Sequence, residues 1–297
     1  MADAELACVA PTGDLCGEGA VWSAGEGCLY WVDINRFLVR RLDGCGRVRS
    51  WLFEEPATAL ALTDRPGTLL VALASRLILW QPRDDSRVPF GEPLADWPRV
   101  RFNDGRPDPQ GRLMIGTMGN NVGPDGEDLP VPPGLGSLFR VGGDGGFTVE
   151  EEGIGVSNTI CWSPDTATFY FADTLANDLR AYAADPETGR LGRSRPVLAG
   201  YDRGAPDGSA VDGAGHIWNC RYGGGCVVRL APDGAIERIV EMPCDNVTTC
   251  TFGGEGLSTL FITTARGGSQ RSERLAGSVF AYPAPVPGLP ERAFRPG

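Results

Sequence analysis

The stretch Arg101–Arg112, RFNDGRPDPQGR, begins with polar side chains, ends in a tight polar turn and leads directly into the apolar run Leu113-Met114-Ile115. A polar turn between short apolar runs is typical of two β-strands joined by a tight connection. The same pattern occurs five more times along the chain, each time with a polar residue, a strand-like segment, a turn and a second apolar run. The other five copies start at Glu18, Thr58, Asn158, Asp207 and Thr248.

Six copies of one strand–turn–strand unit define an internal repeat. A period in the forties is typical of a β-propeller with four strands in each blade. The chain of 297 residues is long for an ordinary domain but suits a closed propeller. The sequence therefore predicts an all-β fold, a six-bladed β-propeller with four-stranded antiparallel blades, in one domain over residues 1–297.

Aligning the six copies on their turns places one polar residue at the same position of every copy. These ring residues are Glu18, Thr58, Asn103, Asn158, Asp207 and Thr248. The first strand of a propeller blade lines the central channel, so equivalent positions converge near one axis. A Glu, an Asp and two Asn there would offer two charges and several neutral oxygens, which suits a hard divalent cation. Asn, Asp and Thr also form turns, but turn chemistry alone does not select a shared register. Thr58 carries no charge and is left out of the expected metal shell.

The formal net charge of −11 makes nucleic acid and anionic membrane surfaces unsuitable partners. Nine cysteines form no CxxC pair, and the N-terminal segment has neither a basic stretch nor a long apolar run. No segment approaches the length of a membrane span. We therefore expect a cytoplasmic protein with mostly buried, reduced thiols.

The chain has a single histidine, His216, which lies away from the ring register and is interpreted as structural. A Ser-His-Asp triad is therefore not expected, and the sequence contains no GxSxG elbow, no P-loop and no GxGxxG after a strand.

Turn signals divide the chain into blades with approximate bounds. Residues 5–10 are expected to pair with the last blade and close the ring, and the segment after Pro283 is expected to be extended. Between Met118 and Gly136 a Gly-, Pro- and acid-rich loop is expected to fold over the channel mouth. Gln270–Leu275 is a second expected loop. The blades are expected near 17–46, 50–89, from 99, 153–192, 201–237 and 246–283.

Several long motifs, in order, point to a known family. GEGAVW, RFNDGRPDPQGRLMIGTM, SNTICWSPD, FADT, PDGSAVD and FITTAR resemble the regucalcin/gluconolactonase family of six-bladed propellers from about Gly17 to Tyr282. This resemblance implies a metal-dependent sugar lactonase that converts an aldonolactone, of the glucono-, xylono- or arabinonolactone type, to its aldonic acid.

The resemblance also implies roles for individual residues. The ligands of one divalent cation fall on Glu18, Asn158 and Asp207. Asn103 lies beside the cation, and Arg101 matches an arginine that contacts substrate oxygens; Asp104 falls next to the site. Calcium is the expected ion, with zinc, manganese, magnesium and ferrous iron as alternatives.

One departure from the family pattern concerns the substrate. Animal members have Met-Ala-Glu-Glu after the Gly-Thr strand, and their second Glu helps to bind substrate. Here the chain has Met118-Gly119-Asn120-Asn121, so the equivalent residue, Asn121, is neutral. The identity of the sugar is therefore left open.

With no histidine in reach, Asp207 is the candidate general base as well as a ligand. Arg101 would donate hydrogen bonds to the sugar, although a surface arginine paired with Asp104 is the alternative. Two other functions stay open: a non-catalytic calcium-binding propeller, and a propeller esterase or organophosphate hydrolase. The expected partner is a small sugar lactone, and the expected state is a monomer or weak homodimer.

Overall fold

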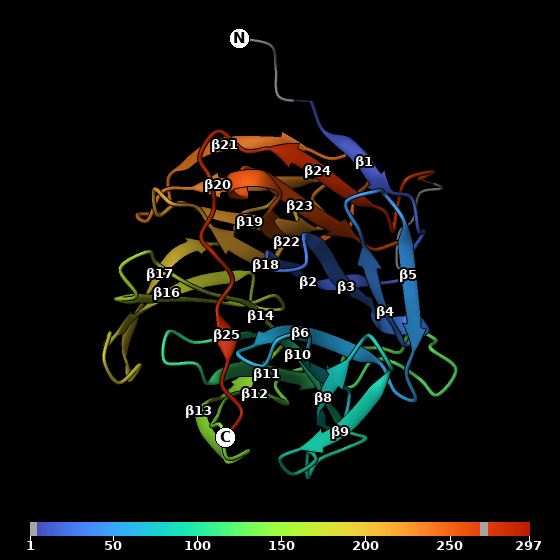
Figure 1. The fold of residues 1–297 in the computed structure, drawn as a ribbon. Coiled ribbons are helices and arrows are strands. Elements are labelled where there is room, and N and C mark those ends of the chain that lie inside the picture. Colours follow the sequence, from blue (N-terminus) through green and yellow to red (C-terminus); the bar gives the residue numbers. More distant parts are fainter. Residues whose placement is uncertain (1–4, 268–272) are drawn as a thin grey trace.

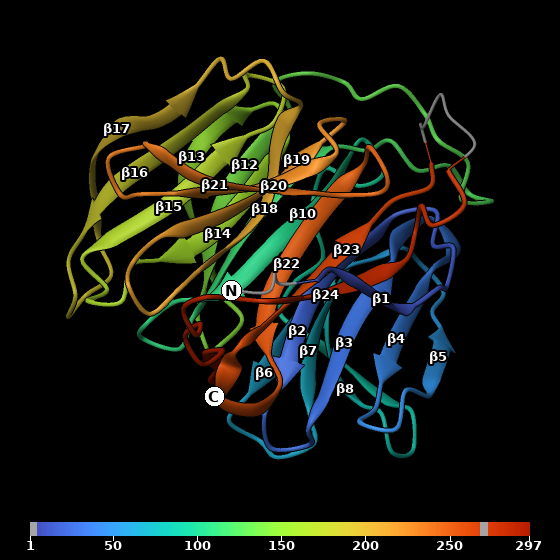
Figure 2. The same cartoon turned by 90° about the horizontal axis from the view of Figure 1, so that it is seen from above.

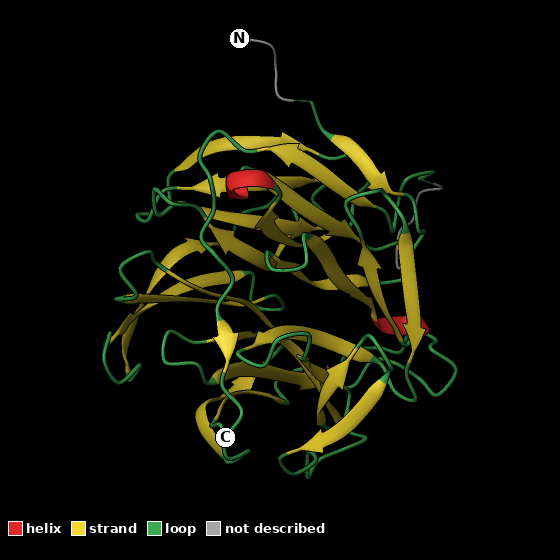
Figure 3. Cartoon of the chain, in the orientation of Figure 1, coloured by secondary structure: helices red, strands yellow, loops and turns green. Residues whose placement is uncertain are grey.

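The structure, a computed structural model, describes residues 5–267 and 273–297. In these residues six antiparallel β-sheets surround a central axis, as the two views at right angles show (Figure 1, Figure 2). Strands dominate, and two short 3-10 helices, η1 (Ile34–Arg36) and η2 (Glu255–Leu257), are the helices of the described chain (Figure 3). The predicted six-bladed propeller with four-stranded blades is confirmed.

Each blade runs from an innermost strand at the axis to an outermost strand at the rim. Blade one contains β2 (Gly17–Ser23), β3 (Cys28–Asp33), β4 (Leu38–Leu42) and β5 (Val48–Leu52); blade two contains β6 (Ala57–Thr63), β7 (Leu69–Leu73), β8 (Leu77–Gln81) and β9 (Ser86–Phe90). Blade three contains β10 (Val100–Pro107), β11 (Leu113–Gly119), β12 (Gly136–Val141) and β13 (Phe147–Ile154); blade four contains β14 (Ser157–Trp162), β15 (Thr168–Asp173), β16 (Asp178–Ala184) and β17 (Leu191–Ala199). Blade five contains β18 (Ala205–Val211), β19 (Ile217–Tyr222), β20 (Cys226–Leu230) and β21 (Ile236–Glu241); blade six contains β22 (Val247–Gly253), β23 (Thr259–Thr264), β24 (Val279–Pro283) and β1 (Ala7–Ala10).

The predicted blade bounds are wrong mainly at the rim. Blade two was expected to start at Ser50, but Ser50 is the middle residue of β5, the outermost strand of blade one. The outermost strands β17 and β21 extend beyond the expected ends of blades four and five. These outer strands are largely exposed, whereas β3 and β11 are buried along their whole length. An exposed strand needs no apolar period, so its sequence signal is weak.

The N-terminal strand β1 closes the ring. It pairs antiparallel with β24, with Ala7 opposite Ala281 and Cys8 opposite Phe280. As predicted, blade six thus combines an N-terminal strand with three C-terminal strands, and β1 covers the edge of β24.

The chain after Pro283 runs across the end of the channel as an extended segment (Figure 1, red). It ends with β25 (Ala293–Phe294), which pairs in parallel with β6 and adds a fifth strand to the sheet of blade two. Of the loop expected at Gln270–Leu275, residues 270–272 lie outside the described residues, and residues 273–275 lie outside any strand or helix.

Apolar packing occurs between blades rather than in one central core. Six clusters of buried apolar side chains are present among the described residues, one at each interface between neighbouring blades. Aromatic residues pack across these interfaces: Trp22 stacks on Phe261 of blade six with ring centroids 5.4 Å apart, and Tyr30 meets Trp80 of blade two edge-on at 6.4 Å. Burial of these faces holds the ring together.

All nine cysteines have free thiols, and six of them are buried. No helix in the described ranges is long and apolar enough to cross a bilayer.

Candidate active site at one mouth of the channel

All six ring residues lie at the start of an innermost strand, at a break in the β-ladder. The pairing register shifts at or directly beside each of them: the breaks begin at Glu18 and Asn158, which are still paired, and the break between Pro206 and Ser209 contains Asp207. The other three breaks surround Thr58, Asn103 and Thr248. A β-bulge leaves a residue without a ladder partner and redirects its side chain. The six bulges explain why one sequence register produces one ring, here called the ring mouth of the channel; its opposite end is the far mouth.

The backbone beside the ring residues has two features that the tight approach of neighbouring strands requires. A Cβ on Gly208, next to Asp207, would lie 2.0 Å from the Thr249 hydroxyl oxygen of the next blade. Thr159, next to Asn158, has φ 54°, a left-handed conformation that costs a β-branched residue energy. The Thr159 hydroxyl donates to the Asp207 carbonyl oxygen, which ties blade four to blade five at this point.

A chain of hydrogen bonds joins the amide side chains of the site. The Asn103 Nδ2 donates to the Asn158 Oδ1 at 3.1 Å and to the Ser157 carbonyl oxygen at 2.8 Å. The Asn158 Nδ2 donates to the Thr174 hydroxyl at 2.8 Å. These bonds turn the Asn158 Oδ1 toward Asn103 and leave that oxygen a second lone pair, which a cation can use.

Arg101 is clamped by two amide oxygens. Its Nε and Nη2 donate to the Asn121 Oδ1 at 3.0 and 2.7 Å, and its Nη1 donates to the Asn103 Oδ1 at 2.8 Å. Arg101 is only 4% exposed, and burial lowers its pKa to about 10. The alternative of a surface arginine paired with Asp104 is wrong, since Arg101 is buried and makes its hydrogen bonds to neutral groups.

Three buried carboxylates lie close enough to repel one another. Burial, followed by the charge of Asp104, raises the pKa of Glu18 to about 8. Burial, followed by Glu18 and Asp104, raises the pKa of Asp207 well above its usual value. Burial also raises the pKa of Asp104, which Arg106 partly offsets. Within the described residues none of the three forms a salt bridge, so their ionised forms lack a counter-charge, which a bound cation would supply.

The residues present fit a hard divalent ion. Glu18 and Asp207 supply carboxylate oxygens, and Asn158 supplies a neutral amide oxygen, the ligand types that calcium and magnesium prefer. In the described chain no three Asp, Glu, His or Cys side chains cluster tightly enough to form a metal site by themselves. A cation held by Glu18 and Asp207 would therefore need the amide oxygen of Asn158 as well.

Two residues near the site were missed by the sequence analysis. The Cys16 thiol lies within electrostatic range of Glu18 and Asp207, and burial is the main cause that raises its pKa. Arg221 of β19 is buried beside Asp207, and its guanidinium bonds to neutral oxygens, among them the Asn219 Oδ1 at 3.1 Å. Both lie outside the ring register; a basic residue inside the apolar strand β19 was the one available signal.

The loop of residues 120–135 leaves blade three and reaches blade one. The Asn35 Nδ2 donates to the Gly126 carbonyl oxygen and to the Asp128 Oδ1, both at 2.9 Å. Val122 is buried in the apolar cluster between blades one and two. The loop therefore spans one side of the ring mouth and brings Asn121 to Arg101, in agreement with its expected course.

His216 lies at the other end of its strand from the site. Its Nε2 is 3.0 Å from the Glu237 Oε2, and the turn before β19 holds its backbone N–H to Asp212. The structural interpretation of this residue is consistent with these contacts.

Residues 16–266 match the family model described as SMP-30/Gluconolactonase/LRE-like region. The chain belongs to this family. A pentonolactonase (XacC) of Haloferax volcanii is 35% identical over 288 residues, covering 93% of both chains. A 6-deoxy-6-sulfogluconolactonase of Pseudomonas putida is 36% identical over 301 residues, covering 97% of this chain and 98% of the relative. The crystal structure of a calcium-binding protein, regucalcin, from Agrobacterium tumefaciens superposes with a TM-score of 0.90 at 30% identity, covering 99% and 98% of the two chains.

Proposed function

We propose that this family member hydrolyses a sugar lactone to its aldonic acid with the help of one divalent cation at the ring mouth. The observation that carries the proposal is the group of three buried carboxylates without salt-bridge partners among the described residues, set beside a buried arginine whose hydrogen bonds go to neutral groups. The lactonases of Haloferax volcanii and Pseudomonas putida, similar over almost the whole chain, support lactone hydrolysis. The Agrobacterium calcium-binding protein supports the choice of calcium.

Glu18, Asn158 and Asp207 would hold the cation. When bound, the cation supplies Lewis acidity that polarises the lactone carbonyl and lowers the pKa of nearby water. The charge of Glu18 serves in binding alone, and Asn103 orients Asn158 through the 3.1 Å hydrogen bond between them.

Arg101 would position the sugar. Its contacts with Asn121, Asn103 and the Phe102 carbonyl oxygen use all of its N–H groups except one on Nη2. That remaining N–H can donate to a hydroxyl or ring oxygen of the substrate. Because Asn121 is neutral, it fixes the guanidinium without cancelling its charge, and Asp104 adds an acceptor at the wall of the site.

Asp207 would act as the base. One of its carboxylate oxygens takes a proton from the attacking water while the water oxygen forms a bond to the carbonyl carbon. When the bond from that carbon to the ring oxygen breaks, Asp207 returns the proton to the departing oxygen. The sum is one lactone and one water converted to one hydroxy acid.

The test is a pH-indicator assay on a panel of glucono-, xylono- and arabinonolactones, after chelation and after addition of each divalent ion. We expect acid release from at least one lactone, its loss after chelation and its return with calcium or another divalent ion. Cation binding without turnover of any lactone would support the non-catalytic alternative. Hydrolysis of aryl esters or organophosphates alone would support the esterase alternative, and activity that survives chelation would contradict the metal.

A further inference from the structure

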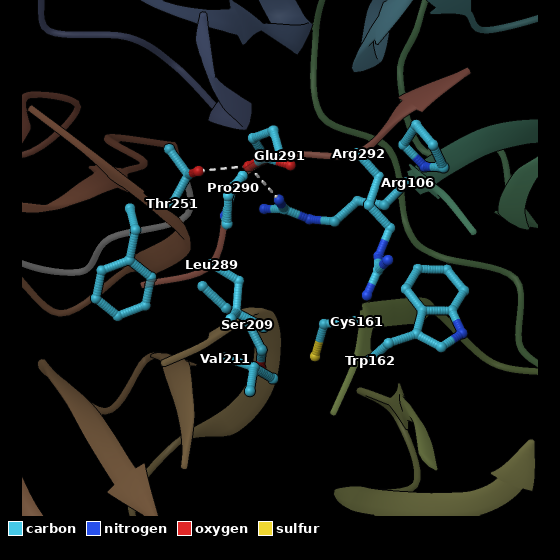
Figure 4. A pocket seen from close by; sticks show the side chains of 13 residues that line it. Arg106, Cys161, Trp162, Ser209, Val211, Thr251, Leu289, Pro290, Glu291 and Arg292 are labelled. Carbon is cyan, nitrogen blue, oxygen red and sulfur yellow. Dashed lines mark hydrogen bonds and ion pairs between the residues drawn. The ribbon is translucent and has the colours of Figure 1, made fainter. Parts of the chain in front are cut away.

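A second pocket lies at the far mouth of the channel, about one strand length from the ring mouth. It has a volume of about 60 Å³ and lies between the ends of innermost strands and the C-terminal segment (Figure 4). Its walls include Arg106 at the end of β10, Trp162 at the end of β14 and Arg292 of the C-terminal segment. A water molecule needs roughly 10–15 Å³ of such space, so the pocket can hold several waters or one small oxyanion.

The two arginines of this pocket differ in their partners. Arg106 donates to the Glu291 Oε1 at 2.7 Å, and the Thr251 hydroxyl donates to the same oxygen. Arg292, by contrast, makes no hydrogen bond or ion pair to any residue that the structure describes. Figure 4 shows its side chain directed into the pocket, toward Cys161 and Trp162.

The carboxylates nearest to Arg292 are already engaged. Asp108 accepts from the Arg112 Nε at 2.8 Å and from two backbone N–H groups, and it forms an ion pair with Arg112. Glu291 is held by Arg106 and Thr251. Arg292 is partly buried, and this burial lowers its pKa, so its charge is neither paired nor fully hydrated. A guanidinium in this state has free donors in the planar arrangement that matches an oxyanion.

We propose that the far-mouth pocket is a binding site for a small oxyanion of the sulfate, phosphate or carboxylate class, held mainly by Arg292. The site is separate from the ring mouth, because it lies at the opposite ends of the same strands. The C-terminal segment supplies Arg292 and, through Glu291, neutralises Arg106, so that one uncompensated positive charge faces the pocket.

Isothermal titration calorimetry of the metal-loaded protein with sodium sulfate, at constant ionic strength, tests the site. Sulfate is the probe because calcium phosphate precipitates. We expect one saturable sulfate per chain and at least tenfold weaker binding in Arg292→Gln. The matched control Arg295→Gln removes the same charge three residues further along the same segment, outside the pocket, and should change the affinity less than twofold.

Sulfate that does not bind saturably to the unmodified protein overturns the proposal. Sulfate that binds equally well to Arg292→Gln also overturns it, since the sulfate would then bind elsewhere, for example to the cation at the ring mouth. Acetate in place of sulfate shows whether a planar or a tetrahedral oxyanion binds more tightly; preferential binding of either one that depends on Arg292 supports the site. Lactone turnover in Arg292→Gln should stay within twofold of the unmodified protein, so the far-mouth site and the proposed lactonase activity can fail independently.

Discussion

The substitution Asp207→Asn separates chemistry from folding at the level of one residue. It keeps the size of the side chain and removes one negative charge and the proposed base. We expect turnover of the best lactone to fall by a factor on the order of a hundred to ten thousand, the usual contribution of a general base. The melting temperature should change little, because Asn suits the same bulge. Steady-state kinetics at saturating cation and calorimetry measure the two quantities.

The control for this substitution is Thr58→Val at an equivalent ring position without an assigned role. Thr58 makes one hydrogen bond, from its hydroxyl to the Ala72 carbonyl oxygen at 3.3 Å, so Val should cost little activity. Near-normal turnover in Asp207→Asn, or full rescue of that variant by added cation, would show that Asp207 is not the base.

Glu18 and Asp207 also predict how stability depends on pH when the cation is removed. Burial and Asp104 raise the pKa of Glu18 from 4.5 to about 8, and the pKa of Asp207 is raised in the same direction. The native state then retains protons that the unfolded chain releases, so this stabilisation is complete below pH 4.5 and is lost as the pH rises through 8.

In chelator, we therefore expect the melting temperature to fall between about pH 5 and 8, and calcium to reduce or reverse that slope, because it binds the ionised carboxylates. Glu18→Gln should flatten part of the slope in chelator. Melting curves from pH 4 to 9 measure it, and a melting temperature that rises over this range in chelator would count against the buried, uncompensated carboxylates.

Among the elements of the fold, the loop of residues 120–135 receives two hydrogen bonds from one side chain of blade one, Asn35. Asn35→Ala removes both hydrogen bonds that fix Gly126 and Asp128. We expect faster amide hydrogen exchange across the loop and a several-fold higher KM, because Asn121 would hold Arg101 less firmly. The effect on kcat should be smaller. Exchange and kinetics unchanged in Asn35→Ala would show that the loop is held by its apolar contacts alone.

The control is Asn177→Ala, which removes hydrogen bonds to Tyr201 and Arg221 on the other side of the ring mouth. It should leave exchange in residues 120–135 unchanged. A loop that exchanges faster in both variants would indicate a general loosening of the mouth.

The elements also show which parts of the site a sequence can predict. The ring residues could be predicted because each lies at a bulge of an innermost strand, so one register places all of them at the same end of the channel. The contact of Arg101 with Asn121 joins residues 20 positions apart through a loop without a period, and only the fold brings them together. Arg221 reaches Asp207 from a second strand, for which the repeat alignment made no prediction.

For the whole molecule, the fold could be predicted more completely than the site, because closure of the ring depends on patterns that recur six times. The inner strands carry those patterns, while the outer strands are exposed and tolerate almost any polar sequence. The far-mouth pocket could not be predicted, since it requires the C-terminal segment to cross the channel and lie beside β10 and β14.

Closure of the ring predicts the result of a truncation. A deletion that ends at Ala10 removes β1 and exposes the β24 edge of blade six. We expect a markedly lower melting temperature and self-association through that edge. A deletion that ends at Glu5 leaves β1 intact and should behave like the full chain. Melting curves and size-exclusion chromatography distinguish the outcomes, and a stable, monodisperse protein without β1 would contradict the role assigned to it.

The bulges at the ring mouth have a consequence for how such a protein can change over time. Because the ladder is already interrupted at or directly beside each ring residue, we expect a new side chain there to alter what the mouth can bind with little effect on strand pairing. Thr58 and Thr248 are the two ring positions that carry neither a carboxylate nor an amide, and each lies at a register shift like those at Glu18 and Asp207. At either position a carboxylate or an amide could be introduced to shift the binding preference from one ion or sugar to another. The ligand specificity of this fold can therefore change by one substitution at a ring position at a time, while the propeller stays the same.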